Sequence, residues 1–339
     1  MKGISVIICC FNSANRIEQT LKYLLEQQIQ DIINWEVILV NNNSNDDTIQ
    51  ISTKFIRNSK VKIDFKIINE PNPGLNYARQ AGFKKAQYEY LLMVDDDNWL
   101  NNHYLETVYK IMNQNLEIGI LGGYGIEKCE VTPPEWFEHY KLSYAVGKHA
   151  QLSGDITSTR GDVYGAGATI RKAAFQKLID LGFETIMTDR SGIQLTSGGD
   201  NEICIALKTI GYQIWCDNRL KFNHFIPKER LTENYIIKLN IAISSSFCLL
   251  RPYYYLLNQE NFNLRPNYKK NWIWIILPRV LHFTFSMSWI HILKYKLTHQ
   301  FNTKVVDAYS RLSYLRTILK EKNNDLKNYY YISSKDWSK

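Results

Sequence analysis

The sequence predicts an α/β fold with a mainly parallel, mixed β-sheet, followed by a helical C-terminal region. Apolar runs alternate with helix-like segments over roughly the first third of the chain, and they are continuous, as expected for strands buried on both faces. From Leu231 to the end, helical patterns replace them. The chain has 339 residues, of which 45% are hydrophobic and 22% charged, so it can bury a substantial core.

Five apolar runs are expected to be strands, at residues 4–11, 35–42, 61–69, 90–95 and 118–123. The segments between them have the spacing of helices. Asn15 to Glu18 resembles a capping box at the start of the first helix. One face of the helix after the fourth strand is expected to carry Tyr104, Leu105, Val108, Ile111 and Met112. Strands separated by helices of this length indicate βαβ units, which bind ligands beyond the carboxyl ends of their strands.

The middle of the chain, from residue 124 to residue 220, is less regular. The pattern predicts, in order, a strand pair over 162–172, a helix over 173–181, a polar turn over 196–202 and two short strands over 213–218 and 220–225. In the helical region, breaks are expected near Pro252, Pro266 and Pro278. The chain is therefore expected to divide into an α/β domain, 1–225, and a basic, aromatic helical region, 226–339.

Polar and acidic residues follow the predicted strands. The first strand ends at Asn12, the second at residues 41–48, and the fourth at Asp95, Asp96 and Asp97. Three crowded carboxylates raise one another's pKa unless a cation lies among them. Mg²⁺ and Mn²⁺ bind one or two carboxylates together with phosphate oxygens, so this triplet indicates a metal and phosphate site. A solvated turn is the alternative, and residues 41–45 can equally be turn formers.

Three further side chains are candidates for chemistry: Asp200, Glu202 and His224. Asp200 follows a Gly-rich turn and could act as a base or only cap the next helix. His224 could bind a metal or be a structural histidine. Trp136 and Trp215 could stack on a sugar or pack in the core.

The motifs, taken in order, resemble those of the family 2 glycosyltransferases, which have the GT-A fold. The resemblance rests on "SVIICCFN", "EVILVNNNSNDDT", "EPNPGLNYARQAG", "YLLMVDDDN", "YGAGATIRK" and "GGDNEICIALKTIGYQIW". It covers about 225 residues and leaves residues 226–339 without a general family motif. It implies a GT-A-type domain that binds a nucleotide-sugar.

The resemblance also implies roles for the acidic triplet. Asp97 would bind the metal, Mn²⁺ or Mg²⁺, that bridges the diphosphate of the donor, and His224 matches a position that ligates it in many relatives. Asp96 is a possible second contributor to the metal, and Asp95 would contact the ribose or position the cluster.

Other matching positions would hold the nucleotide or act on the acceptor. Asn12 and Asn43 would lie near the nucleotide, with Asn41 less certain, and Arg79 would approach the nucleotide or the diphosphate. Asp200 would be the general base. Because this chain has Gly199-Asp200 where the family usually has Glu-Asp, Glu202 remains a rival.

The implied reaction is an inverting, metal-dependent transfer of a sugar from a nucleotide-sugar, with a UDP-sugar favoured, to a hydroxyl acceptor. The acceptor would be a glycan or lipid-linked, in cell-surface polysaccharide or lipid-linked glycan assembly. Two alternatives stay open. A sugar-nucleotide nucleotidyltransferase would need a Gly-rich, basic loop after the first strand, where the chain has "FNSANR". A non-catalytic carbohydrate-binding protein would bind without turnover.

The C-terminal part is basic: residues 221–339 carry 19 Lys and Arg against 7 Asp and Glu, a net charge of +12. Residues 271–296 are strongly apolar but contain Arg279, and lysines and tryptophans flank them, which favours a helix lying in an anionic membrane interface. A buried hairpin and a true span are the alternatives. No nucleic-acid-binding module accompanies the charge, so no nucleic acid is expected as a partner.

The six cysteines lack CxxC spacing, which indicates reduced packing residues. The N-terminus enters a strand directly. We therefore expect a cytoplasmic protein at the inner face of the cell membrane.

Overall fold

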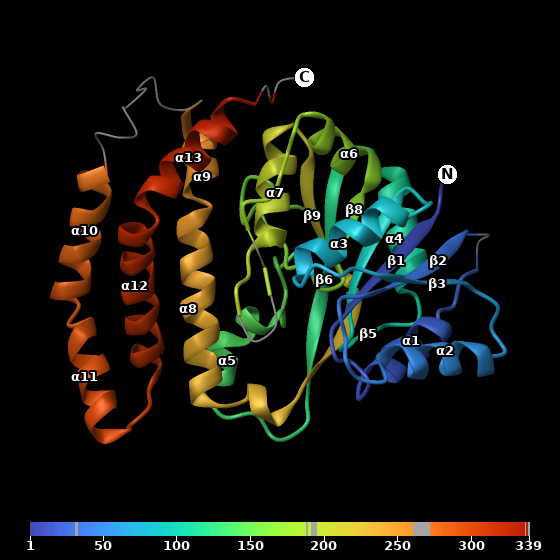
Figure 1. The fold of residues 1–339 in the computed structure, drawn as a ribbon, viewed down its shortest axis with the longest axis horizontal. Helices are drawn as coiled ribbons and strands as arrows, with labels where there is room; N and C mark the ends of the chain where they lie inside the picture. The colour runs from blue at the N-terminus through green and yellow to red at the C-terminus, as the bar shows by residue number, and fades with distance from the viewer. Residues whose placement is uncertain (31–32, 188, 191–194, 260–271, 336, 338–339) are drawn as a thin grey trace.

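The computed structural model describes residues 1–30, 33–187, 189–190, 195–259, 272–335 and 337. In this part of the chain, a nine-stranded mixed sheet carries helices on both faces, and further helices stack at one end (Figure 1). The strands are β1 (Ile4–Cys10), β2 (Trp35–Asn41), β3 (Asp64–Asn69), β4 (Tyr90–Asp95), β5 (Asn98–Leu100), β6 (Ile118–Cys129), β7 (Gly154–Asp155), β8 (Thr169–Arg171) and β9 (Gln213–Ile226).

Helices of the sheet region are α1 (Ile17–Leu25), α2 (Thr48–Asn58), α3 (Leu75–Lys85), α4 (Tyr104–Gln114), α5 (Phe137–Tyr140), α6 (Lys172–Asp180) and α7 (Gly199–Thr209), with short 3₁₀ turns η1 (Lys141–Tyr144) and η2 (Lys228–Arg230). The strand order is β3-β2-β1-β4-β8-β6-β9-β5, with β7 beside β9. Strands β1 to β4 pair in parallel, and β8 is antiparallel to both its neighbours. The mainly parallel, mixed sheet expected from the sequence is confirmed.

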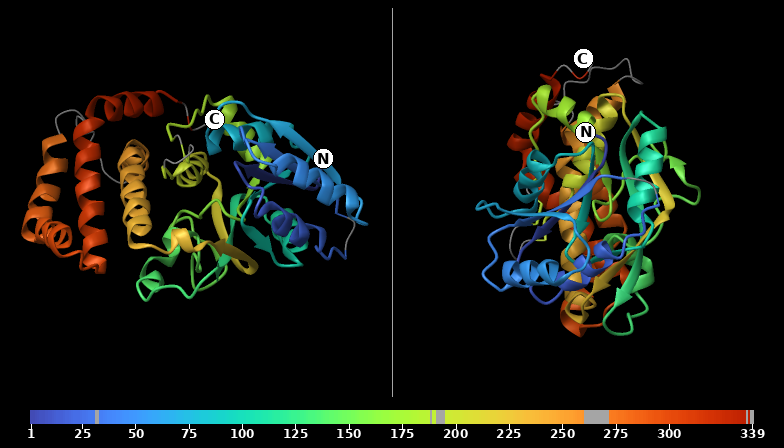
Figure 2. Two further views of the ribbon diagram at one scale, coloured as in Figure 1. Left: turned by 60° about the horizontal axis from the view of Figure 1, so that its bottom comes forward. Right: turned by 90° about the vertical axis from the view of Figure 1, so that its right-hand side faces the viewer.

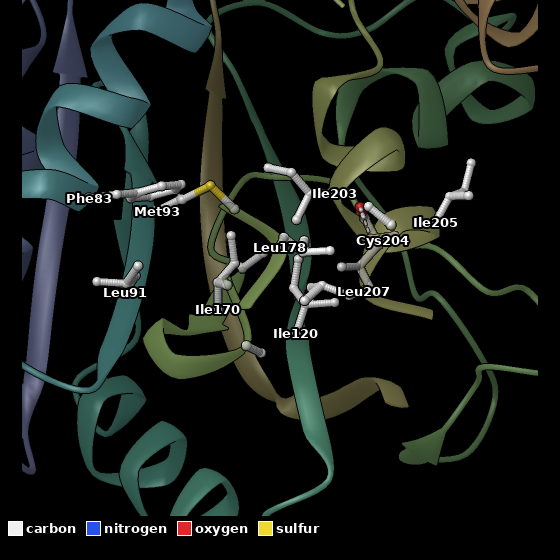
Figure 3. Close-up of a cluster of buried hydrophobic side chains, with 14 of the residues drawn as sticks. Phe83, Leu91, Met93, Ile120, Ile170, Leu178, Ile203, Cys204, Ile205 and Leu207 are labelled. Carbon is white, nitrogen blue, oxygen red and sulfur yellow. Dashed lines mark hydrogen bonds between the residues drawn. The ribbon is translucent and has the colours of Figure 1, made fainter. Parts of the chain in front are cut away.

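The two faces of the sheet are covered by separate apolar clusters because side chains alternate along each strand. On β4, Leu91 and Met93 join the cluster that includes α3, α6 and α7, and Leu92 and Val94 join the one that includes α1 and α4. Figure 3 shows the first cluster, in which Ile120 lies beside Leu207 of α7 and Ile170 beside Leu178 of α6. Strands β1, β2 and β4 are thus buried on both faces, which explains their continuous apolar runs, whereas the edge strand β3 has no fully buried residue.

The capping box expected at Asn15–Glu18 is wrong. Helix α1 begins at Ile17, and no side chain caps it. Instead, the backbone carbonyl of Ser13 accepts hydrogen bonds from the N–H groups of Arg16 and Ile17. The Arg16 side chain reaches the acidic triplet, so this turn serves the site described below.

Two strand assignments in the middle of the chain also need correction. Only Thr169–Arg171 of the expected pair over 162–172 is a strand, because residues 162–168 form a loop in which Gly167 has a φ of +70°. The two short strands expected near residues 213–225 are one strand, β9, which continues past a register shift opposite Gly122 and Tyr124.

The C-terminal helices are α8 (Glu233–Leu249), α9 (Arg251–Gln259), α10 (Trp272–Phe285), α11 (Ser288–Thr298), α12 (Thr303–Lys320) and α13 (Lys322–Ser333). They follow the last strand, which ends at Ile226; a domain boundary at residue 225 stays a prediction. Figure 2 shows α12 between α8 and the α10–α11 pair. The break near Pro252 is confirmed, since α8 and α9 meet there, and Pro266 lies outside the described residues.

A break at Pro278 is wrong, because α10 continues through this proline, which lies on an exposed side where water can reach the unpaired carbonyl. The chain turns instead at Met287, whose φ is +53°. The α10–α11 pair is not buried: its outer side chains are largely exposed, with Phe285 at 78%. Among the helices that the structure describes, none has both the length and the apolarity to cross a bilayer.

None of the six cysteines, all of which lie within the described residues, forms a disulfide. Neither Trp136 nor Trp215 lines the cavity described below. Trp136 contacts the ring of Phe301, with ring centroids 6.0 Å apart, and Trp215 packs against the core under the sheet. Both tryptophans therefore pack against the protein, as in the second of the two interpretations, and neither is placed to stack on a sugar in this cavity.

Candidate active site

A cavity of about 890 Å³ opens beyond the carboxyl ends of β1, β2 and β4. Parallel strands end at the same edge of a sheet, so the loops that follow them meet there. Its walls come from these loops, from the turn before α7, from the end of β9 and from one face of α8. The acidic triplet, Asp200 and His224 all line it, although they are far apart in the sequence.

Asp96 lies deep in this cavity and is held from the turn before α1. Arg16 Nη2 is 2.8 Å from Asp96 Oδ2, and the hydroxyl of Ser13 donates to the same oxygen. Burial and the neighbouring charge of Asp97 raise the pKa of Asp96, and Arg16 opposes this shift. Asp96 is therefore a structurally fixed carboxylate with a cation beside it.

Asp97 is held by a second arginine. Arg230 Nη1 lies 3.0 Å from Asp97 Oδ2, and His224 Nε2 lies 3.4 Å from Asp97 Oδ1. Burial works to raise the pKa of Asp97, but His224 and Arg230 together hold it well below its ordinary value. The charges of the triplet are thus compensated, which is how three aspartates are tolerated at a strand end.

The ring of His224 is oriented as in a metal ligand. Its Nδ1 is 2.6 Å from the carbonyl oxygen of Tyr144, so Nδ1 carries a proton and Nε2 faces Asp97 with its lone pair when the ring is neutral. Two acceptors at 3.4 Å need a proton or a cation between them. In the described part of the chain, no three His, Cys, Asp or Glu side chains form a complete metal site. These two ligands suit a divalent ion whose remaining ligands come from phosphate oxygens and water.

Asp200 lies in the first turn of α7, where the helix dipole favours a negative charge. Its Oδ2 accepts a hydrogen bond of 2.7 Å from Gly165 N–H and its Oδ1 one of 2.9 Å from Asn201 N–H. It does not cap the helix, because Gly198 is at the cap position and no side chain bonds there. The carboxylate is fixed and lines the cavity.

Glu202, the rival base, is outside the cavity. It is fully buried and accepts hydrogen bonds from the N–H groups of Ile186 and Met187 and from the hydroxyls of Thr185 and Tyr253. Its carboxylate joins α7 to the preceding loop and to α9. This position leaves Asp200 as the carboxylate of the two that a substrate can reach.

Arg79 and Asp189 form a buried ion pair at the cavity wall, with Arg79 Nη1 3.1 Å from Asp189 Oδ2. The other oxygen of Asp189 accepts from Gly199 N–H at 2.7 Å, which ties the pair to the residue before Asp200. Arg79 also lies against Gly165, where a Cβ atom would be 2.7 Å from Nη2. Arg79 is therefore beside the candidate base rather than at the far end of the cavity.

The asparagines at the carboxyl ends of β1 and β2 divide into two groups. Asn42 and Asn43 line the cavity, while Asn12 and Asn41 do not. Asn12 holds two loops together, since its Oδ1 accepts from Asn45 N–H at 2.9 Å, and Asn41 donates to Asn69. Asn42 also fixes the loop after β3 by accepting from Gly74 N–H at 2.8 Å.

Sequence reasoning missed three residues at this site: Arg16, Arg230 and Asp189. Arg230 follows His224 by six residues in "HFIPKER", a positive residue near a candidate ligand, which is a weak signal that was available. Arg16 was assigned to a helix cap, and Asp189 lies in an irregular loop with φ +51°, where no spacing pattern points to it.

The model of a known family, described as Glycosyl transferase family 2, matches residues 5–179. TarP of Staphylococcus aureus (strain N315), a poly(ribitol-phosphate) beta-N-acetylglucosaminyltransferase, is 29% identical over 148 residues, 43% of this chain and 44% of that protein. The cholesterol galactosyltransferase of Borreliella burgdorferi is 35% identical over 107 residues, 31% of this chain and 28% of that protein. The chain spans less than half the length of these curated relatives.

The crystal structure of S. aureus TarS 1-349 is similar over 96% of this chain and 92% of that chain, with a TM-score of 0.51 and 16% identity. Its complex with UDP gives the same TM-score at 17% identity. At this identity the likeness shows the fold, and the GT-A architecture expected from the sequence is confirmed.

Proposed function

The chain belongs to glycosyl transferase family 2, and we propose that it transfers a sugar from a UDP-sugar to a hydroxyl acceptor by a metal-dependent, inverting reaction. One observation carries this proposal: a single cavity joins the Asp97–His224 pair to Asp200. The pair suits a metal–diphosphate and Asp200 suits an acceptor hydroxyl.

Asp97 and His224 would hold the metal, Mn²⁺ or Mg²⁺, together with diphosphate oxygens of the donor. When bound, the metal neutralises negative charge on the departing diphosphate. The neighbouring cations Arg16 and Arg230 offset the charges of Asp96 and Asp97, which lowers the repulsion that an incoming diphosphate meets. Asp95, which also lines the cavity, is proposed to position the ribose end of the donor.

For the nucleotide, we propose that Asn43 lies beside it and that Asn12 acts by holding the loops after β1 and β2 together. The complexes of TarS with UDP and with UDP-GlcNAc support UDP as the nucleotide. Arg79, fixed by Asp189, would approach the donor between the diphosphate and the base.

Asp200 would act as the general base. The acceptor oxygen attacks the anomeric carbon, its proton passes to the Asp200 carboxylate, and the bond from that carbon to the phosphate oxygen breaks with its electron pair leaving on the diphosphate. A single displacement of this kind inverts the anomeric configuration. The two backbone N–H groups on Asp200 fix the orientation of its carboxylate.

Assembly of a cell-surface polysaccharide or a lipid-linked glycan is the setting we propose, at the inner face of the cell membrane. Relatives with named roles in polymer synthesis support it, among them a poly-beta-1,6-N-acetyl-D-glucosamine synthase of Staphylococcus epidermidis, 28% identical over 124 residues. Exposed apolar side chains on α10 and α11, with Arg279, Lys294 and Lys296 and no acidic residue in these helices, support peripheral membrane contact. Residues 260–271, which include Lys269 and Lys270, lie outside the described part.

The proposal is tested by thermal unfolding with UDP-, GDP- and dTDP-sugars, each with and without Mn²⁺. A ligand that binds the folded state raises the midpoint. We expect a shift for UDP-sugars that needs the metal and is lost in Asp97→Ala. Asp217→Ala is the matched control, because Asp217 is similarly buried and ion-paired, with Arg219, outside the cavity. No shift with any nucleotide would refute the metal–diphosphate site.

A further inference from the structure

The wall of the cavity formed by α8 is apolar, and the proposed donor chemistry does not explain it. This wall is made by Tyr235, Leu239, Ile243, Ser246, Phe247 and Leu250. Their spacing of three, four and seven residues places them on one face of the helix. We call this surface the α8 face.

The α8 face reaches both ends of the reacting centre. At one end, Tyr235 stacks on Tyr144, with ring centroids 5.9 Å apart, and Tyr144 holds His224. At the other end lies Gly198, which is two residues before Asp200. A Cβ atom on Gly198 would be 3.0 Å from Cβ of Ser246. The α8 face therefore lines the cavity between His224 and the turn that precedes Asp200.

Another face of the same helix is unusually polar. Where α8 meets α12, Ser244 donates to the carbonyl of Ser310 at 2.8 Å, and the hydroxyls of Ser245 and Ser313 are 2.7 Å apart. A helix normally turns its apolar stripe toward its neighbours in the protein. Here hydroxyls share the helix contact with apolar side chains, since Leu239 belongs to one buried cluster with Val305 of α12, and Phe247 stays exposed at the cavity.

Part of this wall is left open to water. Phe247 is 42% exposed, and Leu142, which lines the same cavity from η1, is 48% exposed. Ligand sites commonly combine apolar walls with a few polar groups, because hydrocarbon of the ligand covers the apolar surface. Asp200 provides the polar group at this position.

We propose that the α8 face is an acceptor subsite and that the acceptor carries a hydrocarbon group next to the sugar that is glycosylated. The occupant is thus a glycolipid or a lipid-linked saccharide rather than a free, fully polar glycan. This inference rests on the proposed function, since it assigns the acceptor side of the same cavity. The ring faces of sugars alone do not account for Phe247 and Leu142, which both stay exposed at the cavity.

The test compares methyl and octyl glycosides of the same sugars as acceptors, with UDP release measured as initial rates. With the sugar that is accepted, we expect kcat/KM to be about tenfold or more higher for the octyl glycoside, since each buried methylene contributes to binding. Phe247→Asn should bring the ratio of kcat/KM for the octyl glycoside to kcat/KM for the methyl glycoside toward one. Ile179→Asn should leave the ratio unchanged, because Ile179 is also 42% exposed but lies on α6 outside the cavity.

Equal kcat/KM for the two glycosides, or a ratio that Phe247→Asn does not alter, would overturn the assignment. UDP binding, followed by thermal unfolding in every variant, separates this result from failure of the proposed function. A protein that binds UDP but does not favour the octyl glycoside contradicts the acceptor subsite alone. A protein that does not bind UDP contradicts both.

Discussion

Asp200 and Glu202 lie two residues apart in the first turn of α7, yet their surroundings differ completely. Asp200 lines the cavity, and two backbone N–H groups hold its carboxylate. Glu202 is fully buried and is occupied by hydrogen bonds from the protein. A step of two residues around a helix turns a side chain to a different face, which is how neighbouring carboxylates come to serve substrate and structure separately.

The first prediction follows from the role of Asp200. Asp200→Asn removes the proton acceptor while keeping the volume of the side chain, so we expect sugar transfer to fall by roughly 10²–10⁴-fold. UDP binding with Mn²⁺ should stay close to that of wild type, because the diphosphate site is untouched. Initial rates and thermal shifts measure the two effects. Transfer at the wild-type rate by Asp200→Asn would exclude this residue as the base.

The second prediction concerns pH and Glu202. Burial raises the pKa of Glu202 from 4.5 to about 7, although the N–H of Ile186 and the hydroxyl of Thr185 work against this shift. The folded chain therefore keeps a proton that the unfolded chain releases between these values. Below pH 4.5 the carboxyl of Glu202 is protonated in both states and does not lower the free energy of unfolding. As the pH rises, the free energy of unfolding decreases, and the decrease is complete above about pH 7.

Glu202→Gln removes this titration. We expect the Tm of wild type minus that of the variant to become smaller as the pH rises from about 5 to about 8 at constant ionic strength. Differential scanning calorimetry gives the comparison. A difference that does not change with pH would mean that Glu202 is ionised throughout this range.

At the scale of elements, the loop of residues 162–168 positions the base. It crosses the cavity edge between Arg79 and α7, and Gly165 gives its N–H to Asp200. A side chain at Gly165 would place Cβ 2.7 Å from Arg79 Nη2 and 3.4 Å from Asp200 Cβ. This close approach explains why a loop, not the expected strand, occupies the segment.

The third prediction is that Gly165→Ala displaces the Arg79 guanidinium and lowers kcat/KM by about tenfold or more, because small displacements of positioning groups are costly. Gly119→Ala is the matched control. Its Cβ would also meet a neighbour at 2.7 Å, on Tyr212, but Gly119 is outside the cavity. That variant should lower Tm and leave kcat/KM unchanged. If Gly165→Ala instead lowers Tm and leaves kcat/KM unchanged, Gly165 serves only the packing of the core.

The elements that the sequence predicted well are those with long apolar periodicity. Strands β1, β2, β4 and β6 lie where continuous apolar runs occur, and the face of α4 is buried as expected. The prediction of a break at Pro278 is wrong because the proline lies on an exposed side of the helix, where water can donate a hydrogen bond to the unpaired carbonyl. Local propensity does not carry that tertiary information.

Part of the site could also be predicted from the apolar runs. Asp97, Asp200 and His224 stand beside apolar runs, so topology alone brings them to one edge of the sheet. Arg16 and Asp189 could not be found, since an ion pair between distant loops leaves no spacing pattern in one sequence. Arg230 was available only as a cation six residues after His224.

At the scale of the whole molecule, the chain combines a GT-A sheet with a helical end whose outer surface is apolar and basic. Helix α12 separates the α10–α11 pair from α8 and the cavity (Figure 2). The outer surface carries Leu281, Phe285 and Leu293, which are 45%, 78% and 50% exposed. Apolar patches of this kind indicate an interaction surface, and the absence of acidic residues from both helices favours an anionic partner.

The fourth prediction is that the protein binds vesicles containing about one-third phosphatidylglycerol and binds vesicles of phosphatidylcholine weakly, with salt reducing the difference. Leu293→Ser on α11 should weaken binding in co-sedimentation. Leu319→Ser is the control, because Leu319 is 56% exposed on α12 and stands outside this pair. If both variants bind as wild type does, or if light scattering shows the α10–α11 surface joining two copies of the chain, the surface is not a membrane contact. Binding lost only in Leu293→Ser would connect the helical end to an anionic lipid surface, where an acceptor with a hydrocarbon group would be anchored.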